Sequence, residues 1–237
     1  MKFPPDPAAR KAIEDYEAQR GLVDFPQLHG QDLDFRGADL SGICEIANLA
    51  GANLEGVPMR GTSFVGAILF FMHAPRADFT NADLVKADID GSNLENACLV
   101  NIQGQRASWA SIKAQGADFT GATLYDAFFH NADLRDVSFR DADLFRISWD
   151  GARLAGARFD GATGAVDVDD PVDVGTDESH FIQGDELLAW LHAQGGTELT
   201  AWTPPAEHND VRIFTKSMQR SEGSLLQTLR RWWQRKR

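Results

Sequence analysis

An apolar residue returns at every fifth position over most of this chain. From Leu49 to Phe159 the series has 23 members, and 20 of these centre residues are Leu, Phe, Ile, Met or Trp. An α-helix returns to one face every 3.6 residues and a strand every two, so neither explains a period of five. The chain therefore needs a backbone that turns regularly within each five-residue unit.

Two further columns repeat with the same period. The residue two positions before the centre is alanine in 15 of the 23 repeats and is never charged, and the residue two positions after it is Gly, Asn or Asp in 17. A small apolar column beside a large one predicts that both point inward. Gly, Asn and Asp favour tight turns. We therefore expect short extended segments, joined by turns, that wind into coils stacked about 4.8 Å apart.

The pattern A-(D/N)-(L/F)-x-x resembles the pentapeptide-repeat family over residues 22–164. The resemblance implies a mainly β fold, a right-handed four-sided parallel β-helix with four pentapeptides in each coil. An earlier run at Phe25, Phe35 and Leu40 keeps the spacing, but only nine residues separate Leu40 from Leu49. This step predicts an irregular corner near Glu45.

Both ends of such a coil need a cover, because each exposes unpaired strand edges and apolar interior. Residues 1–21 predict an N-terminal helical cap that starts at Asp6 or Pro7 and places Ile13 and Tyr16 on one side. Residues 165–183 are predicted to be an acidic linker. Residues 184–237 are predicted to be a C-terminal α/β capping or docking region, with a helix in GDELLAWLHAQGG and short strands in TELTAWT and DVRIFTK.

The formal net charge of -12 is unevenly distributed. Residues 22–164 carry 19 acidic and 11 basic residues, residues 165–210 carry 11 acidic and no basic ones, and residues 211–237 carry 1 and 8. Most of the chain would repel a duplex, so we do not expect direct nucleic-acid binding. The two cysteines form no framework or metal motif, and neither a secretory signal nor an apolar span is evident. We expect a cytoplasmic protein.

No residue pattern indicates catalysis, a metal site or a cofactor. The six histidines have no partner at ligand spacing, and the aspartates that precede the centres recur with the repeat, which favours hydrogen bonds to turn backbone. The acidic stretch from Asp167 to Glu178 lacks the glycine of a calcium-binding loop, since Val172 stands at the sixth position. The sequence therefore predicts no enzyme.

Three sets of residues are candidates for binding. Outward positions carry apolar side chains, where small polar ones are usual, at Ile68, Phe70, Phe71, Phe128 and, one face away, Phe145. One face has acidic residues and no basic ones, at Asp88, Asp90 and Asp150. The basic tail predicts a helix with one apolar face made of Leu225, Leu226, Leu229, Trp232 and Trp233.

These sets leave several functions open. The apolar residues predict a surface for a protein partner or for docking of the chain's own tail. The tail helix has three alternatives: docking on its own protein or on a second copy as a homodimer, contact with an anionic membrane, or contact with nucleic acid. We favour a non-catalytic interaction scaffold. Some pentapeptide-repeat proteins are DNA mimics that bind gyrase, so modulation or protection of this topoisomerase is an alternative, and a membrane-surface adaptor is a second one.

Overall fold

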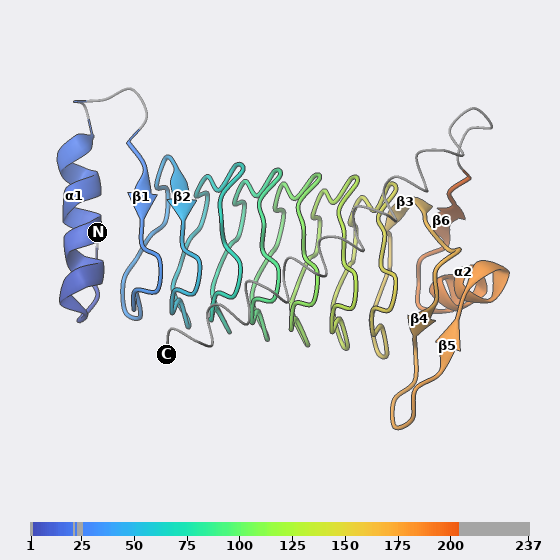
Figure 1. The fold of residues 1–237 in the computed structure, drawn as a ribbon. Helices are drawn as coiled ribbons and strands as arrows, with labels where there is room; N and C mark the ends of the chain where they lie inside the picture. Colours follow the sequence, from blue (N-terminus) through green and yellow to red (C-terminus); the bar gives the residue numbers. More distant parts are fainter. Residues whose placement is uncertain (1, 21, 23–25, 204–237) are drawn as a thin grey trace. The chain divides into compact units, whose positions relative to one another are not determined.

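The structure is a computed structural model that describes residues 2–20, 22 and 26–203 of the 237. The chain divides into two compact units, Met1–Trp202 and Thr203–Arg237, and the description below concerns the first. Its elements, labelled in Figure 1, are α1 (Pro7–Gln19), β1 (Leu28–His29), β2 (Ile46–Asn48), β3 (Thr163–Val166), β4 (Val172–Asp173), β5 (Phe181–Ile182), α2 (Gly184–Ala193) and β6 (Glu198–Ala201).

Successive coils of twenty residues stack in parallel between the two helices (Figure 1). From Asn48 with Ile68 to Arg153 with Asp173, each bridge joins a residue to the one twenty positions later. Because the repeat is five residues long, a coil of twenty holds four pentapeptides, one for each side. The predicted four-sided coil is confirmed at this level.

Every turn of the repeat uses the left-handed backbone region. All 23 residues two positions after a centre have a positive φ, and 13 of them are not glycine. The Asp or Asn before the centre often accepts the backbone N–H two residues on, as Asp83 does from Val85 at 3.1 Å and Asn93 from Glu95 at 3.0 Å. These hydrogen bonds hold the turn, as expected for the recurring aspartates.

The centre residues and the small column form the interior. Phe119, Phe139 and Phe159 are fully buried and stack along the axis, with ring centroids 5.3 and 5.4 Å apart. The alanine column is also buried from Ala52 onward. Where it holds serine, the hydroxyl needs a partner, and Ser92 donates to the carbonyl of Leu69 at 2.9 Å. A narrow interior of large and small columns follows directly from the sequence period.

The first coil is shorter than the others. Asp34 pairs with Asn53, nineteen residues later, and the β1–β2 register shifts between Leu28 and His29. The nine-residue step in the sequence therefore removes one residue from this coil, near the corner expected at Glu45. Phe25 lies outside the described residues.

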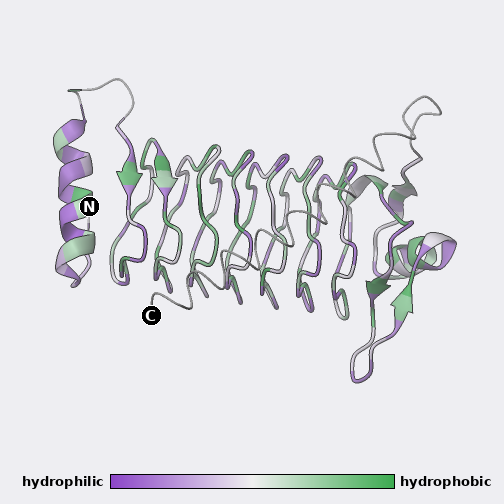
Figure 2. Ribbon diagram, viewed as in Figure 1, coloured by the Kyte–Doolittle hydropathy of each residue, from purple (hydrophilic) through white to green (hydrophobic). Residues whose placement is uncertain are grey.

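Helix α1 covers the end of the first coil. Asp6 caps it by accepting the N–H of Ala9 at 2.7 Å, and Ala9, Ile13 and Tyr16 are buried. Figure 2 shows hydrophilic and hydrophobic bands along this helix, as a capping helix requires. The Tyr16 hydroxyl accepts the N–H of Cys44 at 3.0 Å, which ties the helix to the coil.

The segment 165–183 is not a solvated linker. Val166, Val168 and Val172 are buried, β4 pairs antiparallel with β5, and Asp173 is only 3% exposed. Val166 and Val168 alternate with Asp167 and Asp169, so the valine side packs on the last coil and Asp169 is exposed. Asp173, by contrast, is buried and accepts the N–H groups of Gly175 and His180. The linker was predicted from the number of acidic residues alone, without regard to their alternation with valine.

The described part of the C-terminal cover contains helix α2 and strand β6. Helix α2 buries Leu187 and Leu191, and β6 pairs in parallel with β3, from Glu198 with Thr163 to Ala201 with Val166. The strand predicted in DVRIFTK lies outside the described residues. Within the described part of the chain, no helix is long and apolar enough to span a bilayer.

Candidate functional site

The predicted apolar and acidic residues lie mainly on one side of the coil, here called the first face. It consists of the pentapeptides 47–51, 67–71, 87–91, 107–111, 127–131 and 147–151. Bridges place Ile68 beside Asp88, and Asp88 beside Ser108. Phe128 follows two coils beyond Asp88, where it contacts His130 with a centroid distance of 6.2 Å. Asp150 is exposed and lies three coils beyond Asp90.

Ile68, Phe70 and Phe71 form one group, which we call the aromatic patch. The two phenylalanine rings meet edge to face, with centroids 5.6 Å apart and planes at 77°. The ring of Phe71 lies over Gly91 of the next coil, where a Cβ atom would come 2.5 Å from its Cε1. Ile68 is 42% exposed. Glycine at position 91 thus makes room for a ring that the turn holds on the surface.

Two carboxylates border the aromatic patch on the next coil. Asp90 is 8% exposed and accepts the Ser108 hydroxyl at 2.6 Å and the Ala110 N–H at 2.8 Å, while its carbonyl accepts the Phe71 N–H at 2.9 Å. Asp88 accepts the Asp90 N–H at 3.2 Å. Burial raises the pKa of Asp88 above its usual 3.8 more than this hydrogen bond lowers it. The ionised form of Asp88 therefore costs folding free energy.

The Asp88→Asn variant is expected to be more stable than the wild type at neutral pH. A raised pKa in the folded state means that stability falls as the pH rises above 3.8, the usual value, and the asparagine removes that loss while keeping the hydrogen bond to the Asp90 N–H. The nearest charged groups along the chain are Asp90 and Lys86. Thermal unfolding of the wild type and the variant at neutral pH and at about pH 3 measures this difference. At the lower pH, Asp88 is protonated in both the folded and the unfolded wild type, so the gain from asparagine should disappear.

The control is Asp118→Asn, since Asp118 occupies the same repeat position on another face and accepts both the N–H and the hydroxyl of Thr120. No gain is expected there. A lower midpoint for Asp88→Asn at neutral pH would contradict the cost assigned to Asp88.

Several carboxylates on the other faces have arginine partners from their own chain. Arg60 pairs with Asp78 at 2.5 Å, Arg135 with Asp133 at 2.6 Å, and Arg76 with Glu55. By contrast, the six pentapeptides of the first face contain no lysine or arginine. The first face therefore combines apolar and acidic groups without a cation among its own residues.

Phe145 belongs to a separate cluster, on the fourth face of the coil, which includes the pentapeptides 102–106, 122–126 and 142–146. Its ring stacks on Tyr125 with centroids 5.4 Å apart and planes at 1°. The guanidinium of Arg146 lies 5.5 Å from the Tyr125 ring and 5.7 Å from that of Trp202, and it pairs with Asp126 at 2.7 Å. The sequence analysis grouped Phe145, one face away, with the apolar residues of the first face as a candidate for binding. The ring that stacks on Phe145 belongs to Tyr125, and the spacing of twenty residues between the two could have indicated this contact.

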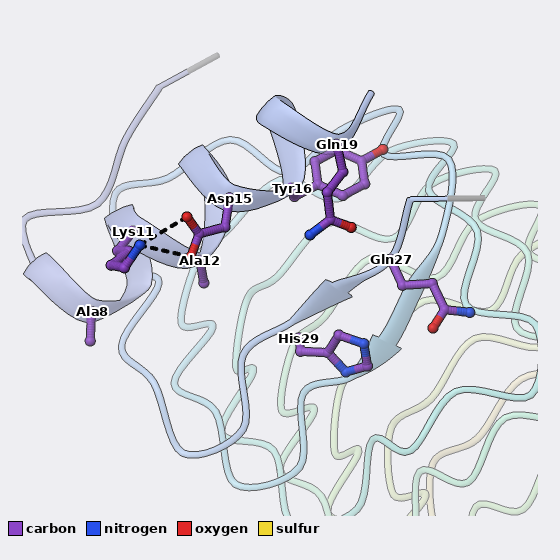
Figure 3. Close-up of a pocket in the computed structure, with 8 residues that line it drawn as sticks. All are labelled: Ala8, Lys11, Ala12, Asp15, Tyr16, Gln19, Gln27 and His29. Atoms are coloured by element: carbon purple, nitrogen blue, oxygen red, sulfur yellow. Dashed lines mark hydrogen bonds and ion pairs between the residues drawn. The ribbon is translucent and has the colours of Figure 1, made fainter. Parts of the chain in front are cut away.

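A pocket of about 400 Å³ opens between α1 and the first coil (Figure 3). Its lining is Ala8, Lys11, Ala12, Asp15, Tyr16, Gln19, Gln27 and His29. Lys11 and Asp15 form an ion pair at 2.9 Å. The sequence analysis missed this pocket, although Ala8 and Ala12, one helical turn apart, leave one side of α1 without bulk.

The remaining predictions concern metal ligands and the C-terminal tail. Among the described residues, no group of three or more His, Cys, Asp or Glu side chains could hold a metal ion. The apolar tail face (Leu225, Leu226, Leu229, Trp232 and Trp233) lies outside the described residues.

Comparison with known proteins identifies the repeat. The family model described as pentapeptide repeats matches eight copies, at residues 71–101 and 115–148. The chain contains pentapeptide repeats. The matched segments include Phe71, both first-face carboxylates of the neighbouring coil, and Phe128. None of the curated proteins compared with the sequence matches it.

Solved structures with similarity include QnrB1, a plasmid-mediated fluoroquinolone resistance protein, in a trypsin-treated form. It is 17% identical, with 74% of this chain and 97% of that chain covered and a TM-score of 0.42. Another is Rfr23 from the cyanobacterium Cyanothece 51142, at 16% identity, with 64% and 96% covered and a TM-score of 0.34. A pentapeptide repeat protein from the Arabidopsis thaliana thylakoid lumen is 24% identical, with 46% and 67% covered and a TM-score of 0.16.

Proposed function

We propose that this pentapeptide-repeat protein is a non-catalytic scaffold, a right-handed β-helix that binds a protein partner through the aromatic patch. Its rigid coils fix surface side chains by backbone hydrogen bonds on both sides of each repeat. Rigid presentation lowers the entropy lost when two proteins associate. Apolar residues gathered on an otherwise polar surface usually mark a contact.

The backbone at Phe71 carries this proposal. Phe71 has a φ of 58° in a column where most members are Gly, Asn or Asp. A bulky side chain in the left-handed region costs about 1–2 kcal/mol relative to glycine. An aromatic residue in this conformation is therefore better explained by a surface contact than by stability. Asp88, which also costs stability, lies on the adjoining coil.

Affinity capture from cells that produce the protein tests the scaffold. Three full-length baits are compared: the wild type, the double variant Phe70→Ser with Phe71→Asn, and the control Val85→Ser with Lys86→Asn. The control changes the same two repeat positions on another face, and Lys86 also has a positive φ of 58°. We expect a captured protein that the patch variant loses and the control keeps.

Stability must be measured on the same baits. Asparagine adopts the left-handed conformation at position 71 at a lower cost than phenylalanine, which stabilises the variant, whereas loss of the ring contact destabilises it. The two effects oppose each other, so Phe71→Asn is expected to change the free energy of unfolding by less than about 1 kcal/mol. If all three folded baits capture the same proteins, the aromatic patch is not the binding surface.

Modulation of DNA gyrase is the second candidate function. The first face has a net charge of -3 over its six pentapeptides, and the family resemblance implies that such a face can imitate a duplex. Against this, Asp150 lies apart from Asp88 and Asp90, and Glu55, Asp78 and Asp133 on the other faces pair with arginine. In a gyrase supercoiling assay, inhibition or drug protection by the purified chain that Asp88→Asn weakens would favour this candidate over the scaffold.

Three predictions from the sequence stay untested. These are the cytoplasmic location, homodimer formation through the C-terminal region and contact of the basic tail with a membrane. Co-sedimentation with anionic liposomes, comparing the full chain with a chain ending at Arg220, measures the last of these.

A further inference from the structure

We propose that the pocket between α1 and the first coil binds an extended segment of a partner protein, which pairs with β1 as an additional parallel strand. This inference goes beyond the proposed scaffold function, because it concerns the N-terminal end of the coil and not the aromatic patch. The segment would be uncharged and would place small or medium-sized apolar side chains in the pocket.

On the first face, each coil pairs with the preceding coil through three main-chain groups. Ile68 donates its N–H to the Ala47 carbonyl at 2.9 Å, and its own carbonyl accepts the Leu49 N–H at 3.0 Å. The Phe70 carbonyl accepts the Gly51 N–H at 3.0 Å. These groups of each strand therefore point toward the N-terminal end of the stack.

The first coil has the same three groups but no coil before it. The equivalent residues are His29, which is in register with Asn48, and Gln31. Leu28 and Gly30 donate their N–H groups to carbonyls on the β2 side, at 3.1 and 2.8 Å, so the N–H and carbonyl of the residue between them point the opposite way. None of the hydrogen bonds between described residues involves the His29 N–H, the His29 carbonyl or the Gln31 carbonyl.

The chain covers other main-chain groups at this end of the coil. Asp39 donates its N–H to the Lys2 carbonyl at 3.0 Å. Cys44 donates its N–H to the Tyr16 hydroxyl, also at 3.0 Å. By contrast, His29 is exposed. An exposed strand edge of this kind is a template for pairing with another extended chain.

The pocket offers a guest strand room beside this edge. Its volume of about 400 Å³ lies within the roughly 300–1,000 Å³ of ligand pockets. Figure 3 shows His29 on β1, with Ala8 and Ala12 on the helix above it. The two alanines form a wall without bulk, which suits an apolar side chain. Lys11 and Asp15 neutralise each other at 2.9 Å, so the lining has no unbalanced charge to attract a charged one.

Hydrogen exchange of the full chain, followed by nuclear magnetic resonance, tests the edge before any ligand is added. The amides of Leu28 and Gly30 are hydrogen-bonded, so we expect them to exchange at least about tenfold more slowly than the amide of His29. A His29 amide as slow as its neighbours would mean that the edge is already covered, by its own chain or by a second copy. That result would overturn the inference.

The probe is the acetylated and amidated hexapeptide IANLAG, the sequence of residues 46–51, because this segment pairs with the same face of the following coil. We expect it to bind and to slow the exchange of the His29 amide. N-methylation of the peptide's leucine removes a donor to the edge and should weaken binding by about tenfold. N-methylation of its asparagine, whose N–H points away from the edge, is the control. Equal effects of the two methyl groups, or no binding at millimolar concentration, would overturn the inference.

Variants of the protein locate the binding. Ala12→Phe fills the pocket and should abolish binding, whereas Ala18→Phe, on the same helix but exposed and outside the lining, should not. His29→Ala keeps the main chain and is expected to change the affinity by less than about twofold. A large loss with His29→Ala would assign the binding to the imidazole and overturn main-chain pairing. If Ala12→Phe lowers the midpoint of thermal unfolding, the comparison of the N-methylated peptides decides.

The outcomes are independent of the scaffold proposal. The double variant Phe70→Ser with Phe71→Asn should bind the hexapeptide as the wild type does, because the aromatic patch lies on later coils. Loss of captured proteins with that variant and failure of the hexapeptide to bind would support the scaffold and overturn this inference.

Discussion

The Phe139→Ala variant is expected to lose about 3–5 kcal/mol of unfolding free energy. The Phe139 ring is fully buried and stacks on Phe119 and Phe159 at 5.3 and 5.4 Å, and it meets the edge of Phe129 at 6.1 Å. The cavity cannot collapse, because backbone hydrogen bonds to the adjacent coils fix the walls around it. Thermal and denaturant unfolding, followed by circular dichroism, measures the loss.

Phe128→Ala is the matched control for this variant. Phe128 has the same chemistry but occupies an outward position and is only half-buried, so a loss below about 1 kcal/mol is expected. Equal losses for the two variants would mean that the interior ladder of rings does not hold the coils together.

Ala117→Asp is expected to destabilise the protein by a similar amount, about 3–5 kcal/mol, because it places an unpaired charge in the interior. Ala117 is 1% exposed and stands in the small column between Ala97 and Val137, both of which are also buried. Neither neighbour offers a charge or a hydrogen-bonding side chain. The midpoint of thermal unfolding should fall accordingly.

Ala117→Ser separates charge from size. Ser92 occupies the same kind of position and is satisfied by the carbonyl of Leu69 and the N–H of Met72. A serine at position 117 can use the equivalent groups, so we expect a change within about 1 kcal/mol. If serine and aspartate were equally damaging, the steric limit of the column, rather than its polarity, would decide what it accepts.

The coil could be predicted from the sequence because every repeat sees nearly the same environment. Leu84, Leu94 and Leu99 lie on different faces but have the same kind of surroundings. The interior pattern can therefore be recognised from neighbouring residues in the sequence, before the fold is known. The cap at Asp6 and the helix around Leu187 were predictable for the same reason: capping and helical spacing are local.

The surface features depend on residues twenty positions apart, and here the prediction was less complete. The grouping of Phe70 and Phe71 with Asp90 followed once the four-sided register was assumed. The neighbours of Phe145 did not follow in this way, because the attraction between Arg146 and the rings is visible only when Tyr125 is placed in the preceding coil. The burial of Val168 within an acidic stretch was missed because net charge was considered before alternation.

The coil also sets how this surface can change through insertion and deletion. Adding twenty residues would lengthen the stack by one coil and leave every face aligned. Adding five would move all later side chains to the adjacent face, a quarter turn about the axis of the coil. Such a duplication between Phe71 and Asp88 would move the carboxylates around a corner from the rings. In the shortened first coil, the loss of a single residue is accompanied by a shift of register beside the cap, whereas all later coils keep the full period of twenty residues.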